Sequence, residues 1–128
     1  MNISSQEYYF DIGANLTHSA FKADLSEVIE ASQKNGVKLL SVTGSDLLES
    51  QQALAIAKKY PEFIISTAGI HPHQAKNYTK SYFSEIIDLL KEDEVRSIGE
   101  TGLDFYRDYS TPSEQEKSFE AHLEIAID

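Results

Sequence analysis

The sequence contains no cysteine, and this absence limits both its covalent chemistry and its metal chemistry. Disulfide bonds and thiolate metal sites are excluded, so any bound metal must use oxygen or imidazole ligands. No apolar run approaches the roughly 20 residues that a membrane-spanning helix needs. The first ten residues, MNISSQEYYF, also lack the basic patch and apolar segment of a secretory signal. We therefore expect no membrane association and a cytoplasmic location, or a nuclear one in a eukaryote.

Basic residues are scarce in these 128 residues. Eleven lysines and arginines face 21 aspartates and glutamates, which gives a formal net charge of −10. Such a charge opposes loose electrostatic binding to nucleic acid. A polyanionic substrate would therefore need help from bound cations.

Apolar runs of strand length alternate along the chain with segments whose apolar residues recur at helical spacing. The expected strands cover residues 8–13, 37–43, 63–69 and 95–99. The expected helices are a stripe from Leu25 closed by Asn35-Gly36, a helix capped by Ser45 or Asp46 that ends before Pro61, a helix capped by Thr79, and a helix that begins with the capping box Thr111-Pro-Ser-Glu114. Four βα units in tandem predict a parallel sheet.

Two parallel architectures compete, an open doubly wound sheet and a closed eight-stranded barrel. The turn after the first strand lacks the GxGxxG pattern of dinucleotide-binding sheets. Polar residues instead follow every strand: Asp11 and Asn15, then Thr43, Ser45 and Asp46, then His71 and His73, then Glu100 and Asp104. An even distribution over successive strand ends is how a barrel builds one site from many loops, so we favour the barrel.

Three stretches of the sequence resemble a known family. They are FDIGANLTHSAF, TAGIHPH and IGETGLDFYRDYSTPSEQEKSFEAHLEIA, and together they cover nearly the whole chain. They are similar to the amino-terminal half of TatD-type metal-dependent deoxyribonucleases, which belong to the amidohydrolase-like barrel group. The resemblance implies a (β/α)₈ TIM barrel of which only the first four βα units are present. Residues 1–128 would then be the amino-terminal half of a single hydrolase domain.

Glu100 ends an apolar strand between two glycines, where a carboxylate is costly to desolvate without a positive partner. The resemblance implies that this partner is a divalent metal. A carboxylate suits Mg²⁺, which we prefer, or Mn²⁺, and neighbouring imidazoles extend the choice to Zn²⁺. The alternative is a structural carboxylate that accepts backbone N–H bonds or pairs with Arg96 or Arg107.

His71 and His73 flank a proline, and the extended backbone that proline favours lets both imidazoles point the same way. The resemblance places His71 in the active-site cavity, as a hydrogen-bond donor to phosphate or a proton source for the leaving oxygen. His73 is a candidate for substrate binding, or else a loop residue. His18 and His122 are expected to be structural or solvated.

The first strand departs from a motif that many relatives carry. Two histidines of a D-x-H-x-H motif are replaced here, and the matching positions are Asp11, Gly13 and Asn15. The TatD branch itself tends to carry this version. Asn15 is then a candidate catalytic residue that hydrogen-bonds a metal-bound water or a phosphate oxygen, or alternatively the start of an Asx turn.

The long segment after the fourth strand holds two further candidates for substrate binding. Arg107 suits bidentate contact with phosphate, or else a surface salt bridge with Asp108 or Glu114. Asp104 could orient a ligand. The aromatic residues of this segment, Phe105, Tyr106 and Tyr109, are expected to pack against the barrel rim rather than to stack on bases.

The first functional hypothesis is a nuclease that hydrolyses DNA phosphodiester bonds with a metal-activated water, from strand ends or on single strands. The alternatives are a non-catalytic half-barrel that self-associates and a related barrel hydrolase of small amides or esters. A (β/α)₈ barrel needs ~250 residues, and in the family two histidines and an aspartate from later strands complete the metal site. We therefore expect the 128-residue chain alone to self-associate or fold poorly, with little nuclease activity.

Overall fold

The computed structural model describes residues 7–128, and its centre is a four-stranded parallel sheet. The strands are β1 (Tyr9–Ala14), β2 (Val37–Val42), β3 (Ile64–Ala68) and β4 (Val95–Ile98). Each strand pairs with the next one along the chain, so the order is β1-β2-β3-β4. A doubly wound sheet would reverse its strand order at a switch point, whereas a barrel wall adds strands in sequence. The described strands therefore form four neighbouring strands of a barrel wall.

Four α-helices follow the four strands: α1 (Leu25–Lys34), α2 (Leu47–Lys59), α3 (Lys80–Leu89) and α4 (Pro112–Ile127). The predicted caps are present, because the side chains of Asp46 and Thr79 accept hydrogen bonds from first-turn N–H groups of their helices and Thr111 and Glu114 form a full capping box. Between Ser45 and Asp46, the cap is Asp46. Two short 3₁₀ helices, η1 (Ser19–Phe21) and η2 (Pro72–Asn77), were not predicted. Segments this short carry no apolar stripe from which to recognise them.

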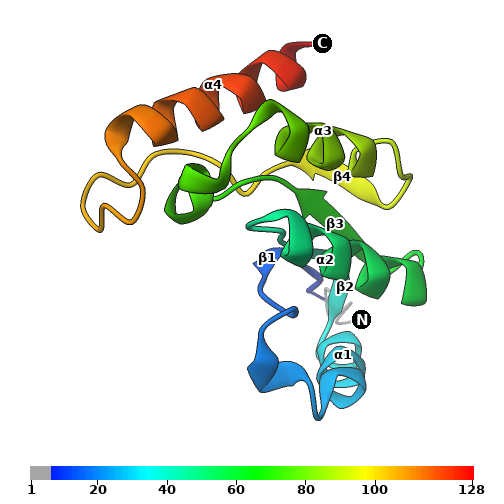
Figure 1. Cartoon of the computed structure of the whole chain (residues 1–128). Coiled ribbons are helices and arrows are strands. Elements are labelled where there is room, and N and C mark those ends of the chain that lie inside the picture. Colours follow the sequence, from blue (N-terminus) through cyan, green and yellow to red (C-terminus); the bar gives the residue numbers. More distant parts are fainter. Residues whose placement is uncertain (1–6) are drawn as a thin grey trace.

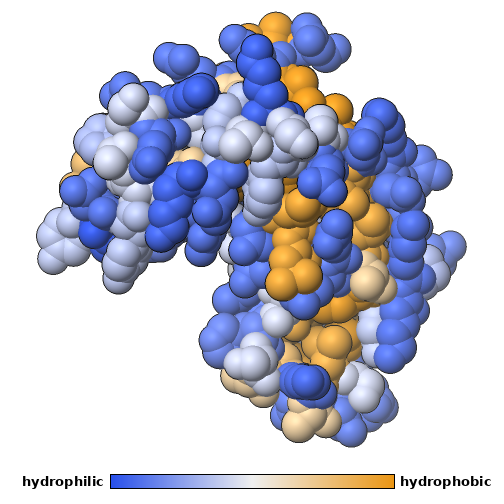
Figure 2. Space-filling view, in the orientation of Figure 1, coloured by the Kyte–Doolittle hydropathy of each residue, from blue (hydrophilic) through white to orange (hydrophobic). Residues whose placement is uncertain are grey.

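The helices stack beside the sheet in chain order, from α1 at one end to α4 at the other (Figure 1). Two apolar clusters hold this arrangement. One joins α1, β2 and α2 through Ile29, Leu40 and Ala57, and the other joins α2, α3, β3 and β4 through Leu54, Ile86 and Val95. Hydrophobic residues also reach the surface in the middle of the molecule, over α1, β2 and α2, with hydrophilic residues on both sides (Figure 2).

Glycines allow the carboxyl ends of three strands to approach closely. A Cβ on Gly44, after β2, would lie 2.7 Å from Cα of Ser50 and 2.8 Å from the carbonyl oxygen of Thr67. A Cβ on Gly69, after β3, would lie 2.6 Å from Cα of Gly99. No real side chain tolerates such distances, so glycine is required at both positions. The loops that follow β2, β3 and β4 therefore start from nearly the same place.

His122 joins α4 to the end of β3 from inside the protein. The ring is 1% exposed, its Nε2 accepts a hydrogen bond from the Ile70 N–H at 2.9 Å, and its Nδ1 donates to the Ser118 carbonyl at 2.7 Å. Burial lowers the pKa of His122. The expectation of a structural histidine is confirmed. His18 is exposed, and its Nδ1 accepts from the Ala20 N–H at the start of η1.

Residues 7–128 contain no helix that combines the length and the apolar character required to cross a bilayer.

The geometry at His122 predicts a loss of stability in acid. Protonation would convert the Nε2 acceptor into a donor that faces the Ile70 N–H, so the folded state favours the neutral ring. Because the pKa of His122 is lower in the folded state than its ordinary value of 6.5, stability present above pH 6.5 is lost progressively as the pH falls below it.

His122→Gln removes the titrating ring and imperfectly replaces its hydrogen bonds. We expect it to cost about 1–3 kcal/mol at pH 8 and to reduce the acid sensitivity of the unfolding midpoint, as measured by thermal denaturation from pH 8 to 5.5. Parallel pH profiles for the variant and the wild type would refute this role.

Candidate functional site

A cavity of about 630 Å³ lies at the carboxyl ends of the four strands. Its lining comes from the ends of all four: Ile12, Gly13, Asn15, Thr43, Ser45, Glu49, His71, His73, Gln74 and Glu100. Parallel strands place their carboxyl ends at one edge of the sheet, which is why residues so distant in sequence meet here. Four of the six predicted site residues, Asn15, His71, His73 and Glu100, line this cavity.

Glu100 presents a free carboxylate to the cavity. Its backbone N–H donates to the Gly44 carbonyl at 2.8 Å, which ties the end of β4 to the end of β2. The residue is exposed, and within residues 7–128 its carboxylate has no hydrogen-bond or ion-pair partner. The alternative of a salt bridge with Arg96 or Arg107 is therefore wrong for the described part of the chain. An unpaired carboxylate in a polar cavity is suited to a hard cation.

His71 is held at the start of η2 in a single orientation. Its backbone N–H donates to the Ser45 carbonyl at 2.8 Å, and its ring Nδ1 accepts from the His73 N–H at 3.1 Å. Burial lowers the pKa of His71, and this effect exceeds the opposite influence of the nearby Glu100 charge. The ring is thus neutral at neutral pH, and because Nδ1 is an acceptor the proton resides on Nε2. His71 therefore offers one N–H donor at the cavity.

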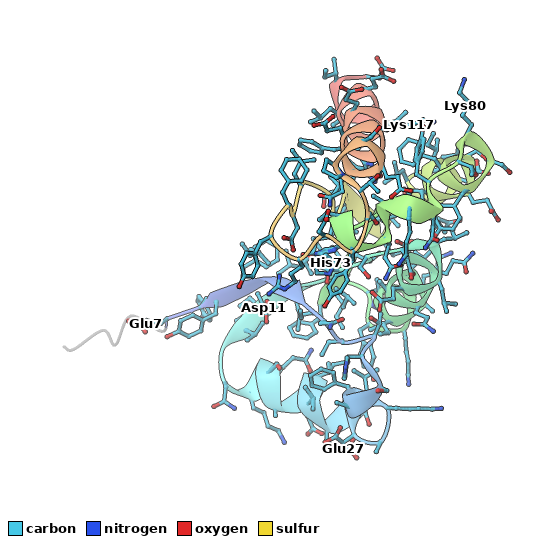
Figure 3. The ribbon with its side chains drawn as sticks, turned by 60° about the vertical axis from the view of Figure 1, so that its left-hand side comes forward. Glu7, Asp11, Glu27, His73, Lys80 and Lys117 are labelled. Carbon is cyan, nitrogen blue, oxygen red and sulfur yellow. The ribbon has the colours of Figure 1, made fainter. Side chains whose placement is uncertain are left out.

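The His73 ring forms a hydrogen bond with Asp104, across 31 residues of sequence. The distance from His73 Nε2 to Asp104 Oδ2 is 2.7 Å. The His73 hydrogen bond, together with backbone N–H groups of the loop, holds the pKa of Asp104 well below its usual range, so the carboxylate stays ionised. The His73 ring also contacts the ring of His71 at 4.3 Å and that of Tyr109 at 4.8 Å, edge to face in both cases. Figure 3 places His73 near the centre of the molecule, between β1 and the loop that leads to α4.

Asp104 and Arg107 do not line the cavity, and both reach it through His73. The Arg107 guanidinium lies 3.3 Å from Asp104 Oδ2. The alternative of a surface salt bridge from Arg107 to Asp108 or Glu114 is therefore wrong, since the guanidinium pairs with Asp104 instead. The Glu114 carboxylate accepts from the Thr111 N–H as part of the capping box. The guanidinium side chain remains 58% exposed and keeps donors available to a ligand.

Asn15 lies at the cavity wall in the loop after β1. Its side-chain oxygen accepts a long hydrogen bond, 3.4 Å, from the Thr17 hydroxyl, and its backbone carbonyl accepts from the His18 N–H at 3.2 Å. An Asx turn would instead place a backbone N–H on the side-chain oxygen. The Asn15 amide is exposed and available to a ligand.

A buried glutamine that sequence reasoning missed fixes the loop after β4. Gln115, 1% exposed, accepts from the Asp104 N–H at 2.7 Å and donates to the carbonyls of Asp104 and Ser110 at 3.1 and 2.8 Å. The Ser110 hydroxyl in turn donates to the His73 carbonyl and accepts from the Lys76 N–H. The yellow and orange loop consequently runs alongside η2 in Figure 1. A glutamine in the first turn of a helix gives no sequence signal for this role.

Two polar cavity residues, Glu49 and Gln74, were also not predicted. Glu49 is in the first turn of α2, and its carboxylate accepts a hydrogen bond from the Ser45 hydroxyl. A signal was available for Glu49, because the first turn of a helix that follows a parallel strand lies near the carboxyl edge of the sheet.

The loop aromatics correct another expectation. Tyr106 is 94% exposed and Phe105 53%, so these two side chains do not pack against a rim in residues 7–128. The fixed backbone between Asp104 and Ser110 presents them to solvent. Tyr109 is 60% exposed, but its ring packs on that of His73 in the cavity wall.

The described residues alone do not assemble a complete set of metal ligands. Residues 7–128 contain no group of three or more His, Asp or Glu side chains placed to hold one ion. Glu100 and the neighbouring imidazoles and amide are nonetheless the donor types that a divalent cation accepts.

Sequence comparison gives matches over nearly all of the chain. The sequence profile of the family described as TatD related DNase matches residues 10–128. The chain is 47% identical over 119 residues to the 3'-5' ssDNA/RNA exonuclease TatD of Escherichia coli K12, covering 93% of this chain and 45% of that protein. It is 44% identical over 119 residues to the protein of the same name from Pectobacterium carotovorum, covering 93% and 46%. The chain thus spans a little under half the length of these curated relatives.

Solved structures show the same fold. A crystal structure of an uncharacterized amidohydrolase from Saccharomyces cerevisiae superposes with a TM-score of 0.76 at 30% identity, over 93% of this chain and 44% of that one. A TatD homolog from Escherichia coli K12 superposes with a TM-score of 0.82 at 20% identity, over 92% and 46%. The four described βα units therefore correspond to slightly less than half of each solved chain.

Proposed function

The chain belongs to the TatD-related DNase family, and on this premise we propose that the protein is a metal-dependent hydrolase that cleaves phosphodiester bonds at the ends of single-stranded nucleic acid. The curated relatives are named as 3'-5' exonucleases of single-stranded DNA and RNA. The observation that carries the proposal is the unpaired Glu100 carboxylate in the same cavity as the neutral, donor-bearing His71. Residues 1–128 are, in this proposal, the amino-terminal half of one barrel domain.

Glu100 would hold a divalent cation, Mg²⁺ in preference to Mn²⁺ or Zn²⁺. A carboxylate ligand and a polar cavity suit Mg²⁺, whereas imidazole ligands would favour Zn²⁺. A bound cation supplies an activated water and neutralises charge on the phosphate. Because residues 7–128 offer no cluster of three acidic or histidine ligands, we propose that the other ligands lie outside the described residues.

His71 is assigned to the phosphate. Its Nε2–H is the free donor of a neutral ring, which suits a hydrogen bond to a non-bridging oxygen or proton transfer to the leaving oxygen. The Asn15 amide, in the loop after β1, would contact a water or phosphate oxygen in the same cavity.

His73, Asp104 and Arg107 form the substrate-binding side of the proposal. Asp104 orients the His73 ring at 2.7 Å and holds the Arg107 guanidinium at 3.3 Å, so one carboxylate positions both groups. A guanidinium contributes phosphate contacts that the overall charge of −10 would otherwise disfavour.

Replacing Glu100 by glutamine should remove metal-dependent activity while keeping the fold. The amide has no charge to offer a cation, and within residues 7–128 the wild-type carboxylate has no partner to lose. The activity measurements on Glu100 and His71 use a protein that contains the complete barrel. There we expect hydrolysis of a fluorescent single-stranded oligonucleotide in Mg²⁺ to fall by about 100-fold or more, and the rise in unfolding temperature caused by Mg²⁺ to disappear. Glu49→Gln, which alters the other cavity carboxylate, is the matched control and should keep the Mg²⁺ shift. A Glu100→Gln protein that Mg²⁺ still stabilises would exclude Glu100 as a ligand.

Replacing His71 by alanine should lower turnover rather than metal affinity. Loss of a donor or acid at the phosphate costs ~10²–10⁴-fold in kcat, whereas the Mg²⁺ concentration for half-maximal activity should stay within about threefold of the wild type. His18→Ala, an exposed histidine outside the cavity, serves as the control. If His71→Ala instead restored full turnover at high Mg²⁺, the histidine would be reassigned as a metal ligand.

Self-association without catalysis is a second candidate, favoured by the surface of β1. Tyr9, Phe10 and Ile12 are 53%, 50% and 77% exposed in the described chain, and hydrophobic residues also reach the surface over α1, β2 and α2 (Figure 2). Such apolar surface tends to be covered. We expect light scattering after size-exclusion chromatography of the 128-residue chain to give a mass above 14.3 kDa, with little nuclease activity. A monomer with chelator-sensitive nuclease activity would contradict both parts.

A barrel hydrolase of small amides or esters is the remaining alternative, and the yeast structure described as an amidohydrolase favours it. Turnover of p-nitrophenyl esters without oligonucleotide cleavage would select this reading.

A further inference from the structure

The segment Leu103–Tyr109, here termed the aromatic loop, exposes four large apolar or aromatic side chains to solvent. Leu103, Phe105, Tyr106 and Tyr109 are 47%, 53%, 94% and 60% exposed. Clustered exposed aromatics are uncommon on a monomer unless they bind something. The aromatic loop is also not required to close the described core, since it belongs to neither apolar cluster.

Hydrogen bonds hold the aromatic loop in this outward conformation. The Asp104 carboxylate accepts from the N–H groups of Tyr106 and Arg107, both at 3.1 Å. Gln115 binds Asp104 at the start of the loop and Ser110 just beyond its end. Folding the aromatics down onto the protein would break bonds of a buried glutamine, which is costly. Their exposure is thus built into the backbone, and a ligand that binds them meets a preorganised surface.

The aromatic loop is continuous with the cavity. The Tyr109 ring lies edge to face with His73 at 4.8 Å, and His73 lies 4.3 Å from His71 in the cavity wall. A row of rings therefore leads from the cavity to the loop. A chain molecule whose end occupies the cavity would leave it past Tyr109, toward Phe105 and Tyr106.

We propose that the aromatic loop binds the unpaired bases of a single-stranded nucleic acid whose terminal phosphodiester lies in the cavity, by stacking them on Phe105 and Tyr106. Bases present flat faces that stack on aromatic side chains whatever their sequence. Arg107, between the two tyrosines in sequence and 58% exposed at its side chain, adds a cation for the intervening phosphates. In a chain of charge −10, stacking provides affinity that electrostatics cannot. This inference rests on the proposed function, because it extends the same site.

The test measures affinity separately from hydrolysis. Binding of a labelled 12-nucleotide DNA strand with methylphosphonate linkages, uncharged and resistant to cleavage, is followed by fluorescence anisotropy. The double variant Phe105→Ala/Tyr106→Ala should raise Kd at least ~10-fold, since each stacked base contributes about 1–3 kcal/mol. Tyr106→Trp should bind as tightly as the wild type or more tightly. Ile127→Ala, an exposed apolar residue at the carboxyl end of α4, should bind as the wild type does.

Cleavage of ordinary 12-nucleotide DNA and RNA in Mg²⁺ by the complete barrel gives the second readout. KM should rise in the double variant to a similar degree for both, because bases rather than sugars are recognised, and the rise should exceed that for a dinucleotide. Equal unfolding temperatures would show that the exposed side chains are not structural.

The outcomes separate the two proposals. Unchanged affinity of the double variant, with hydrolysis intact in the wild type, would overturn base stacking, assign the loop to another partner such as a protein, and leave the proposed function standing. If the double variant lost affinity equally for double-stranded and single-stranded DNA, base stacking would also be overturned, because paired bases cannot stack on side chains. Failure of the wild-type complete barrel to bind or cleave any oligonucleotide would overturn the proposed function and this inference together.

Discussion

The close approach of three strand ends is the constraint on which the site depends. At Gly44, Gly69 and Gly99 the backbones lie so near one another that a side chain on either of the first two would overlap the main chain opposite. The gap is closed by main-chain hydrogen bonds, from Glu100 N–H to the Gly44 carbonyl and from Gly99 N–H to the Ala68 carbonyl, both 2.8 Å. A bulkier residue would separate the strands and move the Glu100 carboxylate away from His71. The metal-ligand candidate and the donor histidine are thus placed by backbone geometry rather than by contact with each other.

Asp104 organises the second half of the site in a different way. One carboxylate accepts from His73, from the Arg107 guanidinium and from two N–H groups of the aromatic loop. These donors keep the Asp104 carboxylate ionised across the neutral pH range. The orientation of a cavity imidazole and the conformation of the exposed aromatics are therefore coupled through a single side chain. Gln115 supports the same loop from the buried side, with hydrogen bonds at both ends.

The charge of the cavity lining is the third feature that governs what the site can bind. The cavity contains the carboxylates of Glu100 and Glu49 and no lysine or arginine. A neutral His71 adds no positive charge to it. The Arg107 charge acts on His71, but its guanidinium is already engaged with Asp104. A phosphate ligand would thus meet a negative cavity, and a divalent cation on Glu100 is the simplest way to reverse that field.

Much of the secondary structure was determined by the sequence alone, because its signals are local. The apolar periodicity of four strands and four helices, and the caps at Asp46, Thr79 and Thr111, each depend on residues within one turn or one strand. The prediction that polar residues after the strands share one edge also held for Asn15, His71, His73 and Glu100, since parallel strands impose it. Only the tertiary structure decided three other features: the pairing of His73 with Asp104, the hydrogen bonds from Gln115 to the loop, and the exposure of Tyr106. These depend on how closely separate backbones approach and in which direction a loop leaves the sheet, and residue periodicity carries no information about either.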